Sequence, residues 1–236
     1  MILDRSSGET RGIRWAFLGT VPYLEALRLQ EQIRAAVLQG DGQETLLLLE
    51  HDPVITLGRN AKTANVLASP AELAKHGIAA VRTSRGGDVT FHGPGQLVGY
   101  PVFRLHRGIR AHVSAIAGGL VAVLAGLGVK AEWRACQPGL WVGNDKICAM
   151  GFHIHRRVAI HGFALNASID LAGFRRITPC GLADAGVTSI AKLVGSAPEP
   201  ECLAGHVARA FERSFGVRMI PIPPASSRLQ IASGNR

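Results

Sequence analysis

One stretch, Arg85–Gln96, limits the backbone more than any other part of this chain. It reads Arg-Gly-Gly-Asp-Val-Thr-Phe-His-Gly-Pro-Gly-Gln. The pair Gly86-Gly87 permits backbone angles and close approaches that a Cβ atom would forbid. Gly93-Pro94-Gly95 predicts a turn, because proline fixes φ and the glycines absorb the reversal. Residues 88–92 alternate polar and apolar side chains, which predicts a short half-buried strand. Taken alone, the stretch fits a plain glycine-rich hairpin as well as a functional loop.

The rest of the chain predicts strands in runs, with helices between them. Residues 97–103 read as the strand after the turn, and Pro101 suits a sheet edge because it cannot donate to a ladder. Further strands are expected at 15–18, 45–49, 54–57, 78–81, 129–133, 140–142, 146–153 and 158–165, and helices at 22–37, 69–77, 112–127 and 203–215. Short spacers between the last three strands predict antiparallel pairing. We therefore expect an α+β fold, with a mixed, mainly antiparallel sheet flanked by helices.

Composition sets the class of protein. The chain has 236 residues, 47% hydrophobic and only 18% charged, which is typical of a soluble globular protein. We expect one catalytic domain over residues 1–220 and a flexible tail, rich in proline and serine, over 221–236. The start of the chain lacks the layout of a signal peptide, and no apolar run is expected to reach membrane-spanning length. Four cysteines without a C-x-x-C pair form no disulfide framework, so we expect a reducing cytoplasm.

The formal net charge of +9 favours acidic partners. An RNA-binding signature, zinc-finger spacing and a run of basic residues are all missing from the sequence, so nucleic acid is not expected. An ordinary solvated surface would also account for the charge.

Cys180 is the best candidate for a nucleophile. It follows Pro179 and precedes Gly181, so the chain is stiff before the sulfur and leaves space beside it. A free thiol has a pKa of about 8.5, and a nearby cation or base would raise the fraction of thiolate at neutral pH. The alternative is a small buried apolar side chain, the commoner fate of cysteine. That alternative suits Cys136, Cys148 and Cys202 better.

Two kinds of side chain could activate this sulfur. Lys146 opens an apolar strand after a tight turn; such a lysine is usually solvated, but buried beside an anionic sulfur it could transfer protons. A Cys-His dyad with His92 or His161 as base is the rival. The histidines at 51, 92, 153, 155 and 161 match no standard zinc spacing, so a metal site is not expected.

Seven ordered segments carry a resemblance to a known family: 49–54, 85–96, 100–101, 139–142, 146–147, 161–166 and 178–181. Over roughly residues 45 to 195 the chain closely resembles the octanoyl-(acyl-carrier-protein):protein octanoyltransferases, also called lipoyl(octanoyl) transferases or the lipoate-protein ligase B family. This many ordered matches is more specific than a lone glycine motif. Two positions depart from the family pattern: Asp88 is often glutamine there, and Phe91 is often tyrosine.

The resemblance implies the fold of the biotin and lipoate protein ligases and a transfer of octanoyl from acyl carrier protein to a lysine of a lipoyl domain. By analogy, Cys180 attacks the phosphopantetheine thioester and carries the acyl group, while Lys146 lowers the pKa of the cysteine and acts as acid and base. The family's acyl-binding walls correspond to Arg85, Gly86, Gly87, Asp88, Val89, Thr90, Phe91, His92, Ala149, Met150, Gly151, Gly162, Phe163 and Ala164.

The resemblance also implies what the reaction needs. The thioester supplies the energy of the final amide, so no cofactor, ATP or metal is expected. The partners are acyl carrier protein and the lipoyl domains of 2-oxoacid dehydrogenase complexes and of the glycine cleavage H protein, which are typically acidic and would be attracted by the positive charge. The alternatives are an ATP-dependent lipoate-protein ligase and a non-catalytic module that binds lipoyl domains or acyl carriers.

Overall fold

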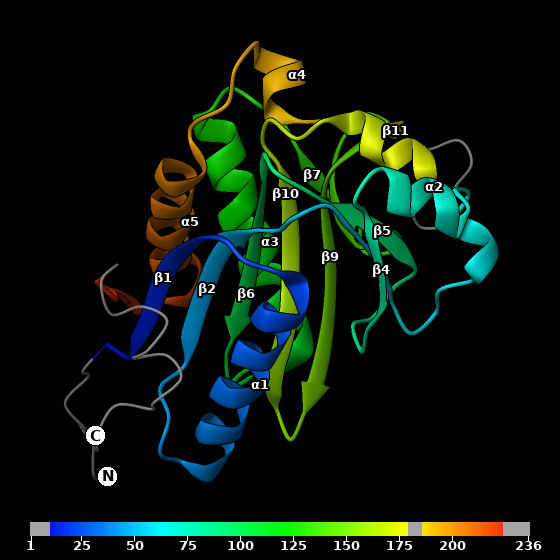
Figure 1. Ribbon diagram of the computed structural model, residues 1–236. Helices are drawn as coiled ribbons and strands as arrows, with labels where there is room; N and C mark the ends of the chain where they lie inside the picture. Colours follow the sequence, from blue (N-terminus) through cyan, green and yellow to red (C-terminus); the bar gives the residue numbers. More distant parts are fainter. Residues whose placement is uncertain (1–9, 179–185, 224–236) are drawn as a thin grey trace, which may run out of the picture.

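A long mixed β-sheet runs through the protein, and helices cover both of its faces (Figure 1). The structure is a computed structural model that describes residues 10–178 and 186–223. The strand order is β12-β1-β2-β6-β10-β9-β8-β7, and β11 pairs with β9. These strands are β1 (Gly12–Thr20), β2 (Thr45–Glu50), β6 (Gln96–Val102), β7 (Glu132–Trp133), β8 (Gly139–Val142), β9 (Asp145–His155), β10 (Val158–Asn166), β11 (Gly186–Val187) and β12 (Arg218–Pro221).

Antiparallel pairs dominate this sheet, as the sequence predicts. The run from β2 through β6, β10, β9 and β8 to β7 is antiparallel throughout, and β1 is parallel to both β2 and β12. The predicted antiparallel pairing of β8, β9 and β10 is confirmed. A separate three-stranded sheet has the order β4-β3-β5, formed by β3 (Val54–Leu57), β4 (Ala79–Arg82) and β5 (Val89–His92).

The helices divide between the two faces of the large sheet. Helix α1 (Tyr23–Gln39) packs on one face over buried Val98, Ile160 and Ala164. Helices α3 (Gly108–Gly126) and α5 (Pro200–Phe215) pack together on the other face, against Leu97, Phe163 and Leu165. The shorter elements are α2 (Pro70–Lys75), α4 (Ile190–Val194) and the 3-10 helices η1 (Thr63–Asn65) and η2 (Leu171–Arg176). Since side chains alternate along a strand, β6, β9 and β10 each serve both layers.

Helix α2 begins as its sequence predicts. Ser69 Oγ accepts from the Glu72 amide, the Glu72 carboxylate accepts from the Ser69 amide (2.7 Å), and Pro70 occupies the first helical position. This reciprocal capping satisfies two amides that a helix terminus otherwise leaves without partners.

Helix α3 is long and apolar enough to cross a membrane by length and composition, with a mean hydropathy of 1.6. This differs from the expectation that no apolar run has that length. Its packing explains the composition, because Ile116, Leu120 and Leu124 are fully buried in the layer that α3 forms with α5 and the sheet. A helix that packs one face into the core needs apolar side chains on that face, and 39% of this apolar stretch is buried.

The stretch around Gly93-Pro94-Gly95 is not a hairpin. Strand β5 pairs with β3 in the small sheet, whereas β6 lies between β2 and β10 in the large one, so the turn links two sheets. The predicted edge position of Pro101 is therefore wrong. The sheet tolerates this proline because the ladder between β6 and β10 stops at Gly99↔Phe163. Beyond that point the His161 amide donates to the Gln30 side chain of α1 (2.8 Å) instead.

The end of the chain holds a strand that the sequence did not predict. Strand β12 pairs parallel to β1, and Ile222 after it is buried, so residues 221–223 belong to the folded part rather than to a tail. The pattern Arg-Met-Ile-Pro is too short to signal a strand by alternation. The rest of the predicted tail, residues 224–236, lies outside the described residues.

Candidate active site

A cavity of about 620 Å³ opens beside the free edge of β9. Strand β8 pairs with β9 only between Val142↔Asp145 and Gly139↔Ala149, so from Met150 onward no strand among the described residues pairs with that side of β9. We divide the residues that line the cavity into two groups, which we call its arms. One arm lies between the sheet and the glycine-rich loop, and the other lies toward α3.

We call the first arm the inner slot. Its floor carries small side chains from three neighbouring strands, on the face that α1 covers: Ala149 and Gly151 of β9, Gly162 and Ala164 of β10, and Val98 of β6. Its roof is the loop from Arg85 to His92. The Gly86 amide donates to the Phe152 carbonyl (2.9 Å), which ties the roof to β9. A Cβ atom at Gly151 would lie 2.8 Å from the Gly86 carbonyl oxygen, so this close approach requires glycine.

Two charged residues hold the roof in place. The Arg85 guanidinium donates to the Thr56 carbonyl (2.6 Å) and to Thr56 Oγ1 (2.9 Å), which joins the loop to β3. The Asp88 carboxylate accepts from its neighbouring Val89 amide (2.9 Å) and from the Asn65 side chain. Charge-assisted hydrogen bonds of this kind are about twice as strong as neutral ones. The roof is therefore a fixed wall.

Aromatic and imidazole rings close the far end of the inner slot. The Tyr100 hydroxyl donates to His51 Nε2 (2.7 Å), and His51 Nδ1 donates to the Val21 carbonyl (2.6 Å). The Tyr23 hydroxyl reaches Thr83 Oγ1 (2.8 Å), and its ring stacks on His92 with centroids 6.3 Å apart. We call Tyr23, Tyr100 and His92 the end wall.

Burial keeps the histidines of this region neutral. Desolvation lowers the pKa of His51 to about 4. Desolvation also lowers the pKa of His92 and of His161 to about 3, and the positive charge of Arg85 adds to the effect at these two rings. His92 Nδ1 donates to the Gln96 side chain (2.7 Å), and His161 Nε2 bonds Ser84 Oγ (3.0 Å). A ring whose pKa is lowered in this way takes up a proton less readily at neutral pH, which favours Lys146 over His92 and His161 as the base.

Lys146 lies on β9, the strand that contributes residues to both arms. Its side chain lines the cavity although the residue is only 6% exposed. Its Nζ is 3.5 Å from the Pro138 carbonyl and 4.7 Å from the centroid of the Trp141 ring. Trp141 is buried, and its indole N–H donates to the Gln137 carbonyl (3.0 Å). A cation over a tryptophan face is stabilised there, which offsets part of the cost of burying the ammonium group.

The second arm, which we call the outer groove, is apolar and open. It is lined by Ile109 and Val113 of α3, Trp133 of β7, and Phe152 and Ile154 of β9. Ile109 is 56% exposed, although it is a large apolar side chain. The ring of His112 on α3 packs edge-on against Phe152 (centroids 5.7 Å apart), so the first turns of α3 lie level with this part of β9.

The structure gathers almost all of the predicted acyl-binding residues at this one cavity. It is lined by Lys146 and by Arg85, Gly86, Gly87, Asp88, Val89, Thr90, His92, Ala149, Met150, Gly151, Gly162, Phe163 and Ala164. Phe91 is the exception and is corrected here: its ring packs against Phe174 (centroids 5.5 Å) in the apolar cluster of the small sheet. Cys180, with Pro179 and Gly181, lies outside the described residues. The roles of all these residues in catalysis and binding stay predictions.

Several lining residues were missed by the sequence reading. Tyr23 of the end wall comes from α1, and the outer groove comes from α3, β7 and the second half of β9, all outside the glycine-rich stretch. No local pattern signals them, because only the tertiary fold brings them to the cavity. In the sequence, Tyr100 stands out only as a position that matches the family.

The other cysteines differ from expectation in part. Cys148 is buried, and desolvation raises the pKa of its thiol to about 12, so it is an inert core side chain as predicted. Cys136 and Cys202 are exposed instead, and Cys136 lines the cavity. Within residues 10–178 and 186–223, no three His, Cys, Asp or Glu side chains are grouped so that they could hold a metal ion.

Comparison with known proteins extends this description. A family model for the lipoyl protein ligase A/B catalytic domain matches residues 22–212. An octanoyltransferase of Solibacter usitatus is 46% identical over 207 residues, which cover 86% of this chain and 93% of that protein. An octanoyltransferase of Myxococcus xanthus is 41% identical over 91% of this chain, and the match spans only 63% of that longer protein.

The fold has solved counterparts as well. Protein Ta0514 of T. acidophilum, described as a lipoate protein ligase and solved with bound lipoic acid, matches with a TM-score of 0.72 at 19% identity, over 92% of each chain. The predicted ligase-like fold is thus confirmed. With a family model over most of its length and relatives above 40% identity, the chain belongs to the octanoyltransferases, the lipoate-protein ligase B family of transferases that act in protein lipoylation.

Proposed function

We propose that this protein moves octanoyl from acyl carrier protein to a lysine of lipoyl domains, through a thioester on Cys180. The observation that carries the proposal is a buried lysine, Lys146, at the open end of a slot floored by alanine and glycine. Such a slot suits a thin, flexible acyl chain, and a lysine at its entrance suits proton transfer during acyl exchange.

The dimensions of the inner slot support an eight-carbon chain. The floor crosses three adjacent strands, β9, β10 and β6, so it spans two inter-strand spacings, or about 9 to 10 Å. An extended octanoyl chain is about 9 Å long at the rise per bond of an extended backbone. At about 0.8 kcal/mol per buried CH₂, its burial would contribute roughly 5 kcal/mol. Length and binding energy are both of the required size.

The proposed reaction has two steps. The Cys180 thiolate attacks the thioester carbonyl of the donor, the bond from that carbonyl to the pantetheine sulfur breaks, and the departing thiolate takes up a proton. The amine of the acceptor lysine then attacks the Cys180 thioester, loses a proton, and releases the Cys180 sulfur as an amide forms. Lys146 exchanges the proton in both steps and, as a cation, favours the thiolate.

The remaining parts of the proposal follow from this chemistry. The donor thioester supplies the energy of the amide, so the reaction uses no ATP, metal or other cofactor. The acceptors are lipoyl domains of 2-oxoacid dehydrogenase complexes and the glycine cleavage H protein, and the compartment is the cytoplasm. Neither nucleic acid nor membrane takes part.

Intact mass measurement after incubation with octanoyl acyl carrier protein tests the proposal. The protein should gain one octanoyl group, hydroxylamine should remove it, and addition of a lipoyl domain should transfer it. Cys180→Ser should abolish the adduct, whereas the exposed-cysteine controls Cys136→Ser and Cys202→Ser should retain it. The proposal fails if the adduct lies on another residue, or if octanoylation of the lipoyl domain requires ATP and free octanoate.

A further inference from the structure

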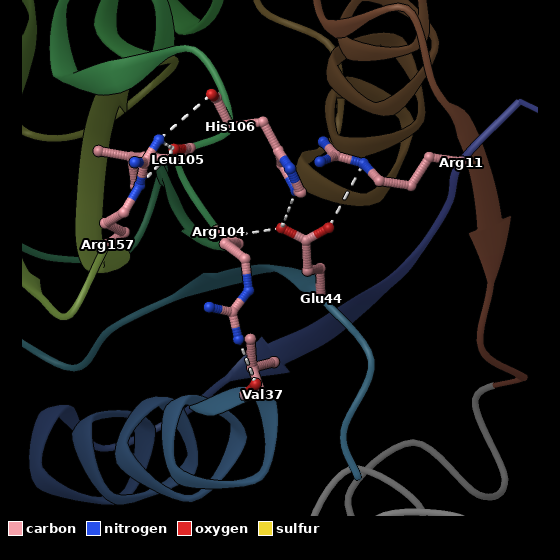
Figure 2. Close-up of polar contacts among 7 residues, drawn as sticks. All are labelled: Arg11, Val37, Glu44, Arg104, Leu105, His106 and Arg157. Carbon is pink, nitrogen blue, oxygen red and sulfur yellow. Dashed lines mark hydrogen bonds and ion pairs between the residues drawn. The ribbon is translucent and has the colours of Figure 1, made fainter. Parts of the chain in front are cut away.

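The outer groove leads from Lys146 to an end of the molecule that is rich in arginine. Arg107 and Arg110 are exposed on either side of Ile109, at the start of α3. Arg156 is exposed in the turn between β9 and β10. Its neighbour Arg157 donates to the Leu105 carbonyl (2.9 Å) and to that of His106, so this turn lies against the segment that leads into α3 (Figure 2). We call Arg107, Arg110 and Arg156 the arginine rim.

Acidic side chains are scarce here. The sequence has no Asp or Glu from Val89 to Ala131 or from Lys146 to Ile169. Glu44 reaches this end from another segment, but it accepts from the Arg104 amide and pairs with Arg11 (3.4 Å) and with His106 (3.9 Å) (Figure 2). No ion pair among the described residues involves the arginine rim. Its positive charge is therefore available to a partner.

From these observations we infer that the outer groove and the arginine rim dock the donor carrier protein. The pantetheine arm lies along Trp133, Phe152 and Val113, and the rim contacts the phosphate and the acidic surface of the carrier. This inference rests on the proposed function, because it assumes that the acyl donor is carried on a phosphopantetheine arm. It adds where the donor binds and which residues recognise it.

The length of the groove fits that arm. From Lys146 to Phe152 along β9 is six residues, or about 20 Å at the rise of a strand. The arm has about thirteen bonds from sulfur to phosphorus and spans roughly 15 Å when extended. With the thioester beside Lys146, the phosphate comes close to the level of Phe152, where the first turns of α3 begin. The long side chains of Arg107 and Arg110 can reach the remaining distance.

The same geometry favours the donor over the acceptor as the occupant. An acceptor lysine has only a four-carbon stem, so its lipoyl domain must approach the Lys146 end of the cavity directly. A partner docked at the arginine rim can deliver a reacting group to Lys146 only if it carries a long arm. The apolar lining, with a half-exposed Ile109, suits the methyl and methylene groups of that arm.

The test compares donors that differ only in the carrier. Acylation of the protein without acceptor is followed by intact mass, using octanoyl acyl carrier protein, octanoyl phosphopantetheine and octanoyl pantetheine, which lacks the phosphate. Arg107→Glu/Arg110→Glu should lower kcat/KM for the carrier protein at least tenfold and change octanoyl pantetheine less than twofold. Octanoyl phosphopantetheine should lie between them. Arg209→Glu, an exposed arginine on α5, is the matched control and should change none of them.

Salt gives a second readout, because surface charge attraction is screened at high ionic strength. The wild-type rate with the carrier protein should fall steeply with salt, and the double variant should lose most of that dependence. The inference is overturned if the carrier rate is unchanged, if all donors slow equally, or if only the KM for the lipoyl domain rises. Failure of the wild-type protein to accept octanoyl from the carrier would instead overturn the proposed function itself.

Discussion

The two arms of the cavity differ in how their walls are held. In the inner slot, Arg85, His92 and Tyr100 are fixed by hydrogen bonds to other parts of the protein. In the outer groove, the walls are apolar, Ile109 is half exposed, and the nearby Arg107 has no ion pair among the described residues. The walls of the inner slot are held by hydrogen bonds within the protein, whereas the outer groove exposes an apolar surface that a partner could cover.

This difference matches two kinds of recognition. A wall held by buried hydrogen bonds cannot move without leaving polar groups unsatisfied, so it discriminates by shape. A charged rim in water attracts many acidic surfaces and gains specificity from the fit of the arm between the two proteins. The inner slot should therefore decide which acyl chain reacts, and the outer groove should decide which molecule brings it.

The largest effect is expected at Lys146, on the strand that contributes to both arms. Lys146→Ala should slow acylation by about 10²- to 10⁴-fold, the usual contribution of a general acid or base, with the carrier protein and the small thioester alike. The defect should be larger at low pH, since the thiol ionises unaided at high pH. Rates measured between about pH 6 and pH 9 check this, with Lys192→Ala, an exposed lysine on α4, as control. A defect confined to the carrier protein would assign Lys146 to docking instead.

The next largest effect is a loss of folding stability at low pH, caused by three buried histidines beside the inner slot. His51, His92 and His161 have folded-state pKa values of about 4, 3 and 3, below the unfolded value near 6.5. The unfolded chain therefore binds more protons below about pH 6.5, and stability falls as the pH drops from there toward the folded-state values. Between about pH 6.5 and pH 5 one such histidine would cost about 2 kcal/mol.

Urea unfolding at several pH values measures this loss of stability. The acylation rate, measured over the same pH range, shows whether the walls of the inner slot open before the whole protein unfolds. Because these histidines lie beside the inner slot, acylation by octanoyl pantetheine should fail at higher pH than global unfolding does. His155, exposed at the end of β9 and outside the cavity lining, provides the control: His155→Gln should leave the pH at which acylation fails unchanged. Stability that stays level down to about pH 5 would contradict neutral burial of the three rings.

The sequence predicted the inner slot better than the outer groove, for a physical reason. The slot needs glycine at Gly87, where φ is +86°, and at Gly151, where backbone approaches backbone, and such positions are visible as local composition. Resemblance to a family then linked the loop to Lys146, and the fold brought them to one cavity. The outer groove is lined by apolar residues of α3, β7 and β9. Their sequence pattern is that of core residues, and only the fold shows that one side of them stays exposed.

The errors in the fold have a similar origin. Pro101 predicts an edge position, but the sheet opens locally on the β10 side and the Gln30 side chain accepts from the His161 amide there. Phe91 belongs to the cluster around Phe174 because successive side chains of β5 point in opposite directions. Both cases depend on partners distant in sequence, which alternation and propensity do not specify.

The smallest expected effect is a change in acyl-length preference, which should occur on substitution in the inner slot and not on substitution in the outer groove. Val98 on the floor and Val113 in the outer groove are the same residue type on opposite sides of the β9 edge. Val98→Ala lengthens the space in front of the end wall, so the ratio of decanoyl to octanoyl transfer should rise by about fourfold for each CH₂ accommodated, at about 0.8 kcal/mol. Val113→Ala should leave that ratio unchanged, because the acyl chain does not reach it. Competition between the two acyl carriers, read by mass in one reaction, cancels any loss of stability in either variant. An unchanged ratio in Val98→Ala, or an equal rise in both variants, would mean that the end wall does not measure the chain.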